Sequence, residues 1–146
     1  MKASTALAGG LAGTFTVALI HESLKKITPA APRMELLDMD ALSKVLKSIN
    51  VKLPEQHELL KLTTAGEIVS HTLYFSLVGT GNKKSVWLKG LLSGLFAGIT
   101  AVALPKPLGL NQPLSNRTPK TEIMTIGMYL FGGLAASGAC KYLTNK

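Results

Sequence analysis

Four apolar, glycine-rich stretches separated by polar loops dominate this chain of 146 residues. They cover about residues 3–20, 62–79, 86–104 and 121–142, and each approaches the length that a helix needs to cross the hydrocarbon core. Hydrophobic residues make up 47% of the chain, more than a soluble domain of this size normally requires. We therefore expect an all-α fold, an integral membrane bundle of four transmembrane helices that forms a single membrane domain over residues 1–146.

Residues 28–61 form an amphipathic loop region between the first two spans. Pro29 and Pro32 interrupt the chain after the first span, and a new helical pattern begins at Arg33. Within 33–49 the apolar side chains share one helix face and the polar side chains share the other: Leu42, Val45, Leu46 and Ile49 against Asp40, Ser43, Lys44 and Lys47. This pattern predicts an amphipathic interfacial helix, lying on the membrane or against the bundle.

The remaining helix ends are marked by turn and capping residues. The turn at Gly81-Asn82 is too short to cross a membrane, so the second and third spans must be antiparallel. Pro105 cannot extend the third helix, and Thr118-Pro119 supplies a cap and a first-turn proline for the fourth. The lysine before the first apolar run suits a signal peptide, but glycines break that run, and we expect a retained span.

The chain carries a net charge of +8, and more of its lysines and arginines lie in the two long loops than at the termini. The positive-inside rule then places the loops in the cytoplasm and both termini outside. These charges either follow this topology bias or contact anionic lipid headgroups of the membrane. Nucleic acid is a poor partner, because the basic residues are scattered and no aromatic residues are interleaved with them.

Five glycines recur at intervals of four residues within two of the spans. Gly9 and Gly13 lie in the first span, and Gly90, Gly94 and Gly98 lie on one face of the third. Small residues at this spacing allow helix backbones to approach closely in lipid. They predict helix packing within the chain or, alternatively, a contact between copies of it.

Five ionisable residues would meet at one membrane face if the spans alternate in direction. Glu67 and His71 are four residues apart on one helix face, His21 and Glu22 end the first span, and Glu122 begins the fourth. Charged groups at such positions are costly and are often functional. The five could hold a divalent metal or accept protons. Alternatively, Glu22 and Glu122 are ordinary interfacial charges, and Glu67 and His71 only hydrogen-bond to each other.

The sequence also resembles the YagU-like proteins, small bacterial inner-membrane proteins of unknown function. The resemblance rests on Ala-Gly-Gly-Leu-Ala-Gly at 8–13, the prolines at 29 and 32, His71 followed by Tyr74, and Gly-Leu-Leu-Ser-Gly-Leu at 90–95. It implies a multi-pass protein of the bacterial inner membrane. Because the group has no established chemistry, the resemblance assigns no catalytic residue.

These features favour a non-enzymatic protein. Nucleophile-elbow, P-loop and dinucleotide-binding motifs are absent from the sequence, so no catalytic residue is assigned. We expect a structural, accessory or assembly subunit that packs with other membrane proteins or with itself in a larger envelope complex. The alternative is a small transporter or a proton- or metal-responsive membrane protein that uses the His-Glu cluster. A divalent metal or a bound lipid is the only cofactor that the residues suggest.

Overall fold

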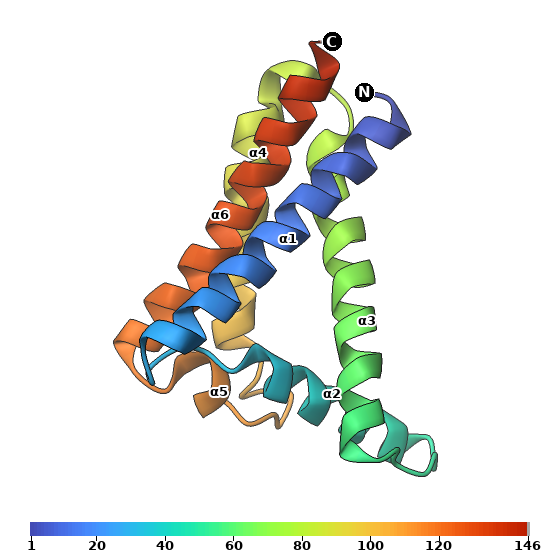
Figure 1. Cartoon of the computed structure of the whole chain (residues 1–146), viewed down its shortest axis with the longest axis vertical. Helices are drawn as coiled ribbons and strands as arrows, with labels where there is room; N and C mark the ends of the chain where they lie inside the picture. Colours follow the sequence, from blue (N-terminus) through green and yellow to red (C-terminus); the bar gives the residue numbers. More distant parts are fainter. Residues whose placement is uncertain (146) are drawn as a thin grey trace.

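The computed structural model describes residues 1–145 of the chain, and every regular element in them is helical. Figure 1 shows the helices in order: α1 (Ala3–Ile27), α2 (Met34–Ser48), α3 (Gln56–Ser76), α4 (Val86–Ala103), α5 (Pro113–Asn116) and α6 (Pro119–Thr144). Two short 3-10 turns, Leu77–Gly79 and Lys83–Ser85, join α3 to α4. The expected all-α class is confirmed over these residues.

The four long helices alternate in direction. Helices α1 and α4 run away from the end that holds both termini, and α3 and α6 run back toward it (Figure 1). Helix α6 packs along both α1 and α4, and α1 also packs on α3. Helix α2 lies across the opposite end, beneath α1 and α3 (Figure 1).

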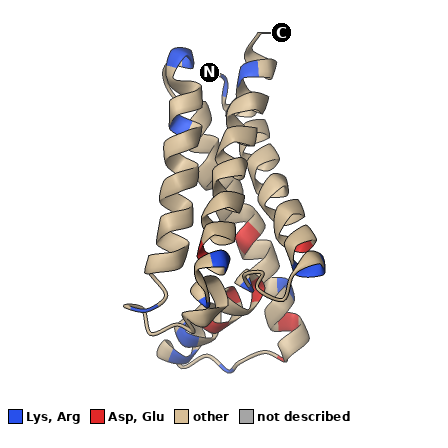
Figure 2. Ribbon diagram, turned by 90° about the vertical axis from the view of Figure 1, so that its left-hand side faces the viewer, with Lys and Arg blue, Asp and Glu red and all other residues tan. Residues whose placement is uncertain are grey.

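Three helical segments are long and apolar enough to cross a membrane: Ala3–Ile27, Lys83–Ala103 and Pro119–Thr144. Figure 2 shows the charged residues concentrated at the two ends of the molecule, with few between them. Helix α3, which we expected to contain the second span, is not among the three. It runs antiparallel to α1 and α4 and parallel to α6, but Glu67, His71 and several hydroxyl groups lower its hydropathy.

Glycines lie where α6 meets α1 and α4. A Cβ atom built on Gly94 would lie 2.6 Å from the Tyr129 carbonyl oxygen, and one on Gly98 would lie 2.7 Å from the Cα of Ile126. A Cβ on Gly13 would lie 2.8 Å from the Gly132 carbonyl oxygen. A Cβ on Gly9 would overlap the Cys140 side chain of α6, and a Cβ on Gly90 would overlap the Ser137 side chain of α6. These backbones can approach so closely only because the side chains are missing.

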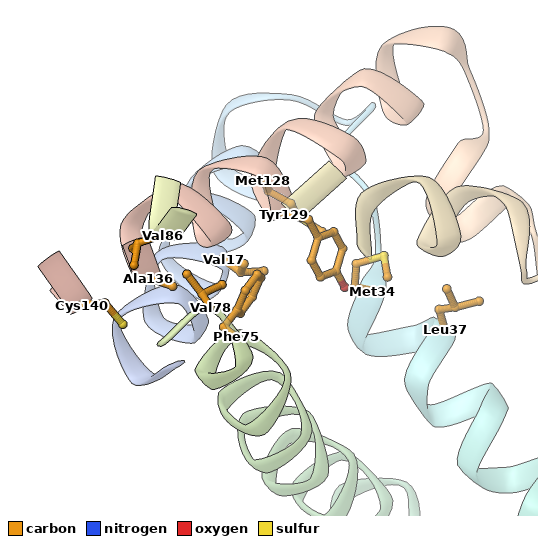
Figure 3. Close-up of a cluster of buried hydrophobic side chains, with 10 residues drawn as sticks. All are labelled: Val17, Met34, Leu37, Phe75, Val78, Val86, Met128, Tyr129, Ala136 and Cys140. Atoms are coloured by element: carbon orange, nitrogen blue, oxygen red, sulfur yellow. The ribbon is translucent and has the colours of Figure 1, made fainter. Parts of the chain in front are cut away.

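A buried apolar cluster lies between these helices (Figure 3). Phe75 and Val78 from the end of α3 and its 3-10 turn are fully buried beside Val17 of α1 and Ala136 of α6. The upper end of α3 is therefore anchored in the bundle. Its lower half is exposed on most sides: between residues 60 and 70, only Thr63 and Glu67 are not exposed.

The buried residues of α2 are not those of the apolar face that the sequence predicts. Met34, Leu37 and Met39, in its first half, are buried, whereas Val45 and Ile49 are exposed. The loop before it is held at the base of the bundle, since the Thr121 hydroxyl donates to the Ala30 carbonyl at 2.8 Å. The N-terminal half of α2 is thus fixed under α1, and the apolar side chains of its second half remain free to meet a membrane surface.

Candidate functional site

The base of α1 and the start of α2 form one polar corner. Helix α1 continues six residues beyond His21, so His21 lies on its last turns and faces α2. The His21 Nε2 atom lies 3.1 Å from the Pro32 carbonyl oxygen, which can only accept a hydrogen bond, so this nitrogen carries a proton. Glu35 of α2 approaches the same nitrogen, with Oε2 at 3.3 Å.

Lys25 links the two helices in this corner. Its Nζ lies 2.7 Å from Glu22 Oε1, on the same helix, and 3.3 Å from Glu35 Oε1, on α2. Burial works to raise the pKa of Glu35, but the adjacent His21 ring, a hydrogen bond with its own backbone and the positive charge of Lys25 lower that pKa to about 2. Glu35 is therefore an anion at neutral pH and holds α2 against α1.

A second pair lies one helix away, on α3. His71 Nδ1 is 3.7 Å from Glu67 Oε1, and both side chains are largely buried. The His71 ring meets the edge of Tyr129 from α6, with the ring centroids 5.4 Å apart. Figure 3 shows Tyr129 pointing toward Met34 of α2, and His71 lines the same hollow as these two residues.

Asp38 of α2 is a site residue that the sequence did not reveal. It lies beside Glu67 and His71 in a hollow of about 260 Å³ between α2 and α3, and it also lines a hollow of about 470 Å³ that reaches Tyr129 and α4. Burial raises the pKa of Asp38 to about 7, and the neighbouring charge of Glu67 adds to the rise. The carboxyl group of Asp38 therefore changes its charge near neutral pH.

A cavity of about 920 Å³, larger than the two hollows beside Asp38, lies between α1, α2 and α3. His21, Glu22, Lys25 and Glu35 line it from one side, and Glu67 lines it from α3. Among the described residues this is the space where most of the predicted site residues meet. The cavity holds both charged and apolar side chains, so it can receive a molecule that has both characters.

The five predicted site residues thus form two pairs and one separate residue. His21 lies 4.0 Å from Glu22, and His71 lies 3.7 Å from Glu67, while Glu122 lines none of the three cavities. Within residues 1–145, no three His, Cys, Asp or Glu side chains are grouped so that they could hold a metal ion. The missed partners, Glu35 and Asp38, are three residues apart on α2, and only the folded position of α2 brings them to the pairs.

No family model, no curated protein and no solved structure matches this chain.

Proposed function

We propose that the chain is a non-enzymatic integral membrane protein of the bacterial inner membrane that serves as an accessory or assembly subunit of a larger membrane complex. The observation that carries this proposal is the lower half of α3. This segment is too polar to qualify as a lone membrane span, yet it stands apart from α4 and α6 and is exposed on most sides. A polar helix of this kind needs protein around it within a bilayer.

The outward face of α3 has the residue pattern of a helix-packing seam. Leu62, Gly66, Val69 and Leu73 follow one another at intervals of four, three and four residues, and all four are exposed. This is the spacing at which side chains of one helix meet another helix. None of the four lines the large cavity, and Leu62 and Gly66 border the smaller hollow beside Asp38.

Gly66 distinguishes this seam from an ordinary lipid-facing surface. A Cβ on Gly66 would have no neighbour within 4 Å, whereas the glycines of α1 and α4 all meet another part of the chain. Glycine inside a helix costs about 1 kcal/mol relative to alanine. A helix from another protein that packs against Gly66 would explain why this cost is tolerated, and α3 would then be the fourth membrane crossing.

Cross-linking from α3 tests the proposal. A photoreactive phenylalanine analogue at Val69 should join the chain to a defined membrane protein in intact cells, and the same group at Phe131, which is exposed on α6, should not. Gly66→Leu should reduce the cross-link without weakening the isolated protein, because a Cβ at this position has no atom of this chain within 4 Å. Labelling of lipid alone from both positions would refute the accessory role.

A second candidate function is a proton-responsive membrane protein or small transporter that uses the His-Glu pairs. The specific observation in its favour is Asp38, a carboxyl group that titrates near neutral pH beside Glu67 and His71. A transporter requires a path across the bundle, whereas the glycine contacts hold α1, α4 and α6 close together. Proton or ion flux through purified protein in sealed vesicles separates this candidate from an accessory subunit, which should show none.

A further inference from the structure

The cavity between α1, α2 and α3 has a definite place in the fold. Helices α1 and α3 touch near Gly10 and Thr72, and the hydroxyl oxygens of Thr14 and Thr72 lie 3.2 Å apart. Beyond this contact the two helices diverge, and α2 closes the wide end (Figure 1). The cavity lies in this wedge, from Thr14 near the contact to Glu55 and His57 at the start of α3. It therefore extends from the apolar part of the bundle to its charged end.

Its charge is opposite to that of the rest of the protein. Four glutamates line it (Glu22, Glu35, Glu55 and Glu67), against the single ammonium group of Lys25. Counting only its glutamates and Lys25, the lining has a formal charge of −3, in a chain with a net charge of +8. Lys25 forms ion pairs with Glu22 and Glu35, and among the described residues no ion pair joins it to Glu55 or Glu67.

One acceptor in the lining is buried without a hydrogen bond. Glu35 Oε2 is shielded from solvent and accepts no hydrogen bond among the described residues. The nearest donor, His21 Nε2, is closer to the Pro32 carbonyl oxygen. A buried carboxylate oxygen in this state is costly, and a donor supplied by a ligand would remove that cost.

The remaining walls are apolar. Ala18, Leu36, Met39, Leu60 and Ile68 face the same cavity. Its volume of about 920 Å³ lies within the range of sites that enclose small organic molecules. An alkyl chain would replace water against these walls, while a cationic group would face the glutamates.

We propose that this cavity binds an amphiphile whose polar end is an ammonium group and whose other end is an apolar chain. Either an ammonium-bearing lipid headgroup or a free long-chain amine presents this chemistry. The inference does not depend on a protein partner, because the cavity is built entirely within this chain and away from the Leu62–Leu73 stripe. An anionic lipid would meet four carboxylates here, which disfavours it.

Native mass spectrometry of the protein in a nonionic detergent tests this proposal with three probes of equal chain length: dodecylamine, dodecanol and dodecanoate. Dodecylamine should remain bound at one copy per chain, and the other two should be retained far less. Glu67→Gln should weaken dodecylamine binding by about tenfold or more, since a buried counter-charge is lost. Glu122→Gln is the matched control, because Glu122 does not line the cavity, and it should leave binding unchanged.

Further measurements keep the test decisive. Should Glu67→Gln not fold, Glu55→Gln removes an exposed carboxylate of the same lining, and Ala18→Phe fills the cavity. To identify the source of the ligand, the protein is extracted from bilayers that contain equal amounts of phosphatidylethanolamine and phosphatidylglycerol. Native mass spectrometry then identifies the lipid that stays bound. Retained phosphatidylethanolamine identifies a lipid source, and dodecylamine binding without it identifies a free amine. Equal binding of dodecanol, preferential retention of phosphatidylglycerol, no dodecylamine binding, or variants that bind like wild type would overturn the proposal.

Discussion

Replacing Gly94 by alanine should destabilise the protein, although alanine is the better helix former. In an open helix the change gains about 0.5 to 1 kcal/mol. At Gly94 the new methyl group would lie 2.6 Å from the Tyr129 carbonyl oxygen and 2.7 Å from the Cα of Leu130. Both are backbone atoms of α6, so relief requires α4 and α6 to separate, and overpacking of this kind costs about 1 to 3 kcal/mol. The expected net loss is up to about 2 kcal/mol.

Gly127→Ala is the matched control on the partner helix. A Cβ at Gly127 meets nothing within 4 Å, so this variant should gain up to about 1 kcal/mol. The free energy of unfolding can be measured for both variants by far-ultraviolet circular dichroism during titration of the micelles with a denaturing detergent. Equal stabilisation by the two changes would show that α4 and α6 do not approach each other as closely as described, and the packing argument would fail.

Three further predictions concern titration, pairing and topology. Because the pKa of Asp38 is raised from 3.8 to about 7, the folded state keeps a proton that the unfolded state releases, so stability should fall as pH rises through this window; unfolding measured across the window should lose that decline in Asp38→Asn. If Glu67 and His71 serve only folding, the double change Glu67→Gln and His71→Phe should cost less than the sum of the two single changes, and additive unfolding free energies would contradict this. A reporter fused after Lys146 should be extracytoplasmic, and one inserted near Lys47 should be cytoplasmic. The reverse result would invert the orientation. If both reporters lay on one side, the number of crossings between them would be even, and the total including the first span would be odd, which contradicts four spans.

The parts of the fold that local chemistry determines could be predicted from the sequence. The Thr118 hydroxyl accepts a hydrogen bond from the Thr121 N–H, and Pro119 occupies the first turn of α6, as expected. The turn at Gly81 has a φ of 69°, which glycine adopts readily. These features depend on a few neighbouring residues, so a single sequence is enough to reveal them.

The parts that depend on distant segments could be predicted only partly. The sequence predicts that Glu67 and His71 lie together, because they are at positions i and i+4 of one helix. It cannot predict that Asp38 lies beside them, because Asp38 belongs to another helix. The periodicity of α2 marked an apolar face, and it could not indicate that Met34 and Leu37 in the first half would be buried while Ile49 stays exposed. Which end of an amphipathic helix packs is decided by the groups that happen to lie beneath it.

The pairing of α1 with α6 has a consequence for how the protein is made. The contacts that Gly9 and Gly13 of α1 make with α6 can form only after α6 has been synthesised and inserted, because α6 follows all the other helices in the chain. During that interval α1 can pack on α3 near Gly10 and Thr72, but its face toward α6 remains in contact with lipid or with the insertion machinery. A ribosome that stops before α6 therefore releases a chain in which one packing face of α1 is still uncovered, and such products should be the preferred substrates of membrane quality-control proteases.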